Sequence, residues 1–159
     1  MERLREKDDI CYRLASMQAR IFEKSANEGI ASYFFIQQFA YSFDAEILDN
    51  LRFLLSGFSE LEIYLDTKRN TKRQNGKVFP PEVMHWIGYF YRNASYLMGI
   101  NSKTLFKKIP PQKLYNVYPL YHGLDIQKTI DMVFETVDFE ELTPLERFKK
   151  LYEEGLIDL

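Results

Sequence analysis

Residues 80–99 read PPEVMHWIGYFYRNASYLMG, and this stretch decides the fold. Apolar side chains recur along it every three to four residues, which is the spacing of one face of an α-helix: Val83, Trp86, Ile87, Phe90, Ala94, Leu97 and Met98. Pro81 suits the first turn of a helix, and Gly99 suits the position just after its end. The apolar stripe is wide, so we predict a helix near residues 81–98 at the centre of the core.

The flanking sequence predicts further helices rather than strands. Residues 10–21 and 32–40 carry apolar side chains at helical spacing, and Tyr118–Gly123 reads as irregular. Residues that favour helix starts are Asp8 or Asp9, Ser42, Ser59, Ser102, Pro111, Asp125 and the pair Thr143–Pro144. Because no segment alternates strictly in steps of two, we predict an all-α fold, a single compact irregular bundle of about six to eight helices. Residues 1–159 form one domain in this interpretation.

Between residues 66 and 78 the hydrophobic pattern stops. The sequence DTKRNTKRQNGKV is basic and polar until its last residue, with Gly76 near its end. A stretch of this length and composition is typical of a loop that is mobile or functional. We therefore predict a basic loop at residues 66–78.

Composition narrows the class of protein. The chain has 159 residues and a formal net charge of -2, with 46% hydrophobic residues and 16% aromatic ones. These values describe one ordinary soluble domain, and they exclude a disordered tail or a strongly cationic nucleic-acid binder. Cys11 is the only cysteine, so no intramolecular disulfide framework can form. The charged start and the lack of a long apolar run predict a cytoplasmic protein with no membrane partner.

The residues that usually carry chemistry are few. The two histidines, His85 and His122, stand far apart in sequence, and no zinc motif or phosphate-binding glycine loop occurs. The sequence therefore predicts no catalytic residue, no metal and no cofactor. An enzyme remains as an alternative, with His122 as a general acid or base; that alternative requires a cleft that holds His122 near Arg92.

Aromatic residues and one arginine are candidates for contact with a partner protein. His85, Tyr89 and Arg92 share a helix face that the periodicity turns away from the apolar stripe. The full candidate set is Tyr89, Arg92, Tyr115, Tyr118, Tyr121 and His122. Aromatic residues are enriched at the centres of interfaces. The alternative is that these side chains fill the protein's own core.

Basic residues offer a second kind of site, for nucleic acid or another anion. The candidates are Lys68, Arg69, Lys72, Arg73 and Lys77. Residues 94–109 also have the outline of a helix-turn-helix, with Ser102, Lys103 and Thr104 as base readers. Against this, the pI is near 5.8, and Pro110-Pro111 end the second helix early.

Several motifs together resemble a family of small, uncharacterised bacterial proteins. They are WIGYFYR at 86–92, SKTLFKKI at 102–109, Leu114-Tyr115, YHGLD at 121–125, FIQQF at 35–39 and Asp49-Asn50. Where that family tends to be aromatic after the arginine, this chain has Asn93-Ala94-Ser95. Members resemble accessory proteins of toxin–antitoxin or mobile-element modules, and no catalytic residue carries over. The resemblance implies a protein that neutralises or accommodates a partner.

Our leading hypothesis is a non-enzymatic, cytoplasmic protein-interaction module, in the manner of an antitoxin. The expected partner is another protein, such as a toxin encoded nearby, and a homo-oligomer is compatible with the sequence. The first alternative is a DNA-binding regulator that uses residues 94–109 and the basic residues 68–77. The second is an enzyme that uses His122.

Overall fold

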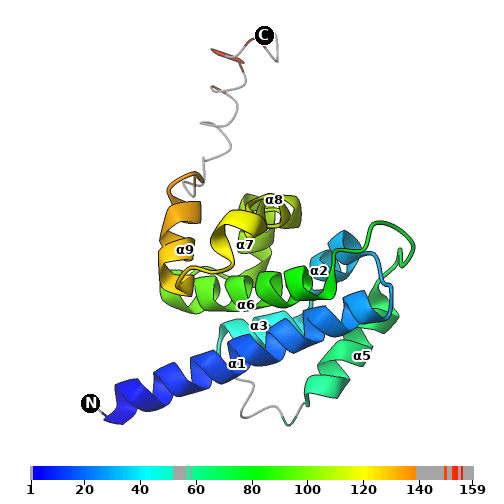
Figure 1. Ribbon diagram of the computed structural model, residues 1–159, viewed down its shortest axis with the longest axis horizontal. Helices are drawn as coiled ribbons and strands as arrows, with labels where there is room; N and C mark the ends of the chain where they lie inside the picture. Colours follow the sequence, from blue (N-terminus) through cyan, green and yellow to red (C-terminus); the bar gives the residue numbers. More distant parts are fainter. Residues whose placement is uncertain are drawn as a thin grey trace.

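The structure is a computed structural model that describes residues 2–51, 57, 59–138, 149, 152, 153 and 155, with side chains from residue 9 onward. Within these residues the chain forms helices and no strand, which confirms the all-α prediction. The helices are α1 (Glu2–Asn27), α2 (Ser32–Ala40), α3 (Phe43–Asp49), α5 (Glu60–Asn70), α6 (Pro81–Met98), α7 (Ser102–Lys108), α8 (Pro111–Tyr121) and α9 (Ile126–Phe134) (Figure 1).

Helix α6 is the central element, as its apolar stripe predicts. It runs beside α1 along most of its length, and α8 and α9 pack on its other side (Figure 1). Gly88 makes the close approach to α1 possible, since a Cβ at this position would lie 2.8 Å from the carbonyl oxygen of Gln18. Phe22, Ile87 and Phe90 are fully buried in the resulting core. The α1–α6 pair therefore forms the scaffold on which the shorter helices are placed.

Three of the predicted helix starts, at Ser42, Ser59 and Asp125, are confirmed by side-chain caps, and Pro111 lies in the first turn of α8 as predicted. The hydroxyls of Ser42 and Ser59 accept hydrogen bonds from backbone N–H groups at the starts of α3 and α5, and Asp125 does the same for α9. Gly99 ends α6 with a φ of 66°, a left-handed conformation that glycine adopts without strain. Ser102 is not a cap: Asn101 caps α7 by accepting from the N–H of Thr104.

The predicted basic loop at residues 66–78 is wrong at its start, because α5 continues to Asn70. Thr67 is buried on the inner face of α5, and its hydroxyl donates to the carbonyl of Ile63. Lys68 and Arg69 lie in the last turn, where positive charge is favourable to the helix dipole. The last residues of α5 are mostly polar because only a few side chains on its inner face are buried, and this polar composition led to the prediction of a loop.

Three other boundaries differ from the sequence prediction. Helix α1 begins at Glu2, so neither Asp8 nor Asp9 is its cap. Helix α8 continues to Tyr121, into the segment predicted to be irregular, because Pro119 lies in its last turn and removes only one intrahelical hydrogen bond. Helix α9 ends at Phe134, whereas the apolar pattern predicts a helix from Ile126 to about Val137. The helix predicted to begin at Thr143–Pro144 falls outside the described residues.

The segment between α5 and α6 is attached to the start of α2. The N–H of Ala31 donates to the carbonyl of Gln74, and the N–H of Ser32 donates to that of Lys77. The hydroxyl of Ser32 accepts from the N–H of Phe79. These bonds satisfy donors at the N-terminus of α2, which an isolated helix would leave without partners. They also place the basic residues of the segment beside α2.

None of the helices in the described part of the chain combines the length and apolar character that a membrane span requires.

Candidate functional site

Arg92 is the least expected residue of the predicted contact set, because it is 0% exposed. Its Nε donates to Gln18 at 2.7 Å, its Nη1 to Asp49 at 2.7 Å and its Nη2 to the hydroxyl of Ser102 at 3.0 Å. The prediction that Arg92 faces a partner is therefore wrong. Helical spacing placed it off the apolar stripe, but the surrounding helices cover that side of α6 as well.

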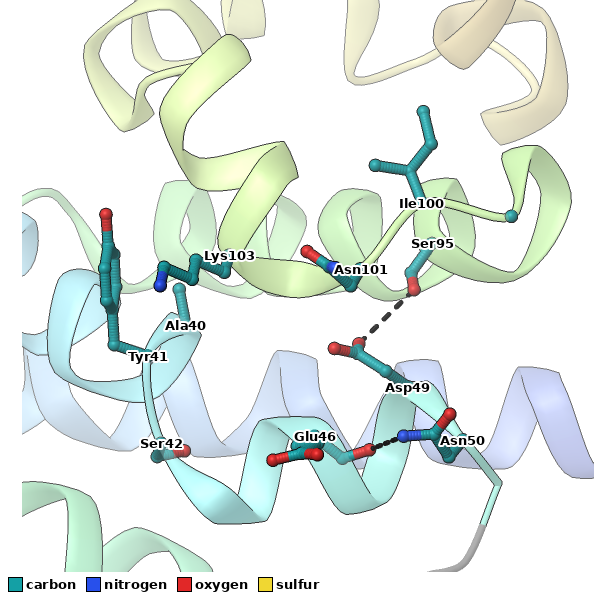
Figure 2. Close-up of a pocket in the computed structure, with 11 residues that line it drawn as sticks. Ala40, Tyr41, Ser42, Glu46, Asp49, Asn50, Ser95, Ile100, Asn101 and Lys103 are labelled. Atoms are coloured by element: carbon teal, nitrogen blue, oxygen red, sulfur yellow. Dashed lines mark hydrogen bonds between the residues drawn. The ribbon is translucent and has the colours of Figure 1, made fainter. Parts of the chain in front are cut away.

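Asp49 completes this buried network from the end of α3. Its carboxylate accepts a hydrogen bond from Ser95 (Figure 2). It also accepts hydrogen bonds from both the backbone N–H and the hydroxyl of Ser102. The ion pair with Arg92 is thus fully hydrogen-bonded, which is the condition under which a buried pair is tolerated. We call Gln18, Asp49, Arg92 and Ser102 the buried network. It joins α1, α3, α6 and α7.

The tyrosines of the predicted contact set mostly pack within the protein. Tyr115 stacks on Phe79 with ring centroids 4.6 Å apart, and Tyr118 packs edge-on against Trp86. Tyr89 and Tyr121 are half-buried. Tyr115, Tyr118 and Tyr121 pack against the core, and each keeps some exposed surface. The alternative that these rings fill the protein's own core is therefore partly correct for these three tyrosines.

His122 is exposed, and its described side-chain contacts are with Tyr118 rather than with the buried network. Its ring stacks on Tyr118 at 4.4 Å, and its Nδ1 lies 2.7 Å from the carbonyl oxygen of that same residue. The donors of Arg92 are directed to the buried network instead. These two side chains therefore do not form the cleft that the enzyme alternative requires, and that version of the hypothesis is wrong.

The five basic residues predicted to contact an anion fall into three groups. Lys68 and Arg69 are paired with acidic side chains of the protein itself, Glu28 and Asp66. Lys77 lies over the rings of Phe79 and Tyr115, 4.4 Å from the centroid of the latter. Lys72 and Arg73 are exposed and have no ion-pair partner among the described residues.

Lys72 and Arg73 lie beside aromatic residues of α2, and α7 brings two more lysines to the same surface. The guanidinium of Arg73 lies 5.2 Å from the ring centroid of Phe34. Lys103 and Lys107 place their ammonium groups 5.1 and 5.9 Å from the ring centroid of Tyr41. We call the set Tyr33, Phe34, Tyr41, Lys72, Arg73, Lys103 and Lys107 the basic aromatic face.

Buried Phe106 holds the two halves of the basic aromatic face together. Its ring contacts both Tyr33 and Tyr41, with centroids 5.5 and 5.9 Å apart, and so packs α7 onto α2. Tyr33 and Tyr41 nevertheless remain 43% and 46% exposed. Lys103 and Lys107, like the two cations of the loop, have no ion-pair partner among the described residues.

Two hollows flank Tyr41. The first, of about 310 Å³, is lined by Phe34, Gln37, Gln38, Tyr41, Lys72 and Arg73. The second, of about 560 Å³, lies between α3 and α7, with Tyr41 and Lys103 toward one end and Asp49 and Ser95 toward the other (Figure 2). The first contains two cations and no acidic residue. The second contains Glu46 and also Asp49, whose charge is paired with Arg92.

The sequence prediction includes three of the seven residues of the basic aromatic face. It named Lys72 and Arg73, and it treated Lys103 as a base reader, but it assigned Tyr33 and Tyr41 no role. The helix-turn-helix version needs correction, because Ser102 is buried in the network and cannot read bases. Helix α7 has only seven residues. A signal that was available is the position of Tyr33 and Tyr41 off the buried stripe of α2.

A third hollow lies between the start of α3 and α5, where the carboxyl groups of Asp44 and Asp66 meet. It is lined by Phe43, Asp44, Glu62, Leu65, Asp66 and Arg69. Burial, together with a hydrogen bond and repulsion from the Asp66 carboxyl, raises the pKa of Asp44 to about 6. One carboxyl oxygen of Asp44 is buried with no hydrogen-bond partner. Among the described residues, no three His, Cys, Asp or Glu side chains gather as metal ligands would.

No family model, no curated protein and no solved structure matches this chain.

Proposed function

We propose that this protein is a non-enzymatic interaction module of the cytoplasm that binds a partner protein through the basic aromatic face. The observation that supports the proposal most directly is the grouping of unpaired cations around two tyrosines that are almost half exposed. Arg20 and Lys68, by contrast, have acidic partners within the protein.

The chemistry of the face matches that of interface centres. Tyrosine and arginine are over-represented among the residues that dominate binding energy, because they bury a large area and also form hydrogen bonds. Tyr41 occupies the middle position, between two hollows and next to two lysines. It is the side chain whose removal should cost the most affinity.

An antitoxin-like role is the specific form of this proposal, and it rests on the family resemblance. In this form the partner is a toxin encoded nearby, and binding blocks the toxin. The test is co-expression with the product of the adjacent gene. Copurification and relief of any growth defect are the expected results, whereas absence of both would contradict the antitoxin-like role.

The proposed face is tested in the same experiment with the variant Tyr41→Ala. The matched control is Tyr12→Ala, since Tyr12 is 52% exposed on α1, outside the basic aromatic face. Tyr41→Ala should weaken copurification by about tenfold or more, in the range of an interface hot spot, and Tyr12→Ala should not. Equal effects of the two substitutions would contradict the use of this face.

A further inference from the structure

We infer that the basic aromatic face binds an acidic protein segment, and that one carboxylate of this segment occupies the hollow between Phe34 and Tyr41. The inference rests on the proposed function, since it names the chemistry of the partner for the same face. It requires that the hollow offer hydrogen-bond donors, uncompensated positive charge and room for a carboxylate side chain.

Charge is the first argument. The hollow is lined by Lys72 and Arg73 and by no acidic residue. Lys68 and Arg69, only a few residues earlier in the chain, are paired with Glu28 and Asp66. The structure thus neutralises Lys68 and Arg69 and leaves Lys72 and Arg73, beside α2, without acidic partners among the described residues. An acidic group from another chain would supply the missing charge.

Hydrogen bonding is the second argument. Gln37 and Gln38 line the same hollow, and their side-chain amides make no hydrogen bond to any described residue. The guanidinium of Arg73 lies over the ring of Phe34 at 5.2 Å, which leaves its edge free. A planar guanidinium binds a carboxylate through two parallel hydrogen bonds, and the neighbouring amides can donate further ones.

The position of Tyr41 extends the site beyond a single carboxylate. Lys72 and Arg73 share the first hollow with this ring, and Lys103 shares the second. A segment that crosses Tyr41 can therefore present acidic side chains to the cations at both sides of this ring. Lys107, 5.9 Å from the same ring centroid, adds a fourth positive charge.

The same cations argue against single-stranded nucleic acid as the occupant. Nucleic-acid binders of that kind stack bases on open aromatic faces. Here Arg73 lies over Phe34, while Lys103 and Lys107 lie over Tyr41, so a base would have to displace them. The net charge of -2 and the presence of Glu46 in the second hollow also disfavour a polyanion.

The test measures fluorescence anisotropy with the full chain and three labelled probes. They are a peptide of repeating Glu-Tyr-Glu, its Gln-Tyr-Gln counterpart and an oligouridine of matched charge. The acidic peptide should bind at least about tenfold more tightly than the neutral one, and added salt should weaken it because the contacts are exposed. Equal affinity for the two peptides, or tighter binding of oligouridine, would overturn the inference.

Charge reversal locates the site. Arg73→Glu/Lys103→Glu should weaken binding of the acidic peptide by about tenfold or more, since both cations would contact it. The control Arg13→Glu/Lys128→Glu changes the net charge by the same amount at exposed positions on α1 and α9, and it should retain most of the affinity. Equal losses in both variants would mean nonspecific attraction and overturn the inference. Arg73→Gln/Lys103→Gln repeats the test without introducing new acidic groups.

The outcome separates this inference from the proposed function. Copurification of the protein partner could depend on Tyr41 and yet be unchanged by Arg73→Glu/Lys103→Glu. In that case the proposed interaction module is supported and the inference of an acidic segment is wrong. If the acidic peptide binds at this face while the adjacent gene product does not copurify, the antitoxin-like role is wrong and the acidic-segment inference stands.

Discussion

Arg92 and Arg73 carry the same guanidinium group in opposite surroundings. Arg92 is fully buried, and its three nitrogens donate to Gln18, Asp49 and Ser102. Arg73 is exposed, rests over the ring of Phe34, and has no acidic partner among the described residues. The fold therefore satisfies one arginine completely and leaves the other to solvent or to a ligand.

The comparison separates two uses of charge in a small helical protein. A buried charge must be neutralised where it lies, because removing it from water costs several kcal/mol. The buried network does this, and it fixes α1, α3, α6 and α7 relative to one another. An exposed charge carries little such cost, so it can stay unpaired until a partner arrives. Predictions for the two regions should differ in both size and kind.

The largest effect should come from breaking the buried network. Asp49→Ala removes the carboxylate and leaves Arg92 charged and buried, so the free energy of unfolding should fall by about 3–5 kcal/mol. Urea denaturation followed by circular dichroism measures this. Arg20→Ala is the control: it breaks the Arg20–Glu60 pair, whose side chains are about half exposed, and it should cost less than about 1 kcal/mol. A similar loss in both variants would mean that burial of the pair has no special importance.

The fold was predictable from sequence because it depends on periodicity and on local caps. The apolar stripe of residues 81–98, Gly99 and the cap at Ser42 are readable within a single helix, and all three are confirmed. The end of α5 could not be predicted in this way, because it depends on the burial of Thr67 within the folded protein. Polar composition alone cannot distinguish such a helix end from a loop.

The candidate site was harder to predict because its parts come from three separate stretches of chain. Arg92 was assigned to the surface, since periodicity on one helix does not reveal what covers its other faces. Tyr33 and Tyr41 were not singled out, although Lys72 and Arg73 were. The tyrosines and the two cations come together because Ala31 and Ser32 form hydrogen bonds to the loop, and the local sequence does not predict those bonds.

The next effect concerns Asp44, which lacks the full set of partners that Asp49 has. Burial and the neighbouring Asp66 carboxyl raise its pKa in the folded protein to about 6, so the folded state keeps a proton that the unfolded chain releases near pH 4. Stability should therefore fall as the pH rises from about 4 to 6. With each pKa unit equivalent to about 1.36 kcal/mol, the contribution is roughly 2–3 kcal/mol.

The variant Asp44→Asn isolates this contribution. Asparagine stays neutral and keeps an N–H donor toward Asp66, so the variant should be more stable than the natural protein at pH 7, by up to the same roughly 2–3 kcal/mol. The difference should shrink toward pH 4, where Asp44 is protonated. Asp131→Asn, at an exposed position on α9, is the control for the loss of one carboxylate, and its unfolding is measured over the same pH range. If the difference in unfolding free energy between Asp44→Asn and the natural protein stayed constant from pH 4 to 7, the raised pKa of Asp44 would be refuted.

The smallest effect on stability should come from the basic aromatic face. Lys103→Ala/Lys107→Ala removes two exposed ammonium groups whose described contact is the ring of Tyr41, so the free energy of unfolding should change by less than about 1 kcal/mol. Urea denaturation measures the change, and the loss of unfolding free energy in Asp49→Ala, where a buried ion pair is broken, is the reference for comparison. If the double variant instead cost as much as Asp49→Ala, the two lysines would be holding α7 against α2. Their lack of acidic partners would then reflect a structural role, and it would no longer indicate that this face is kept available for another molecule.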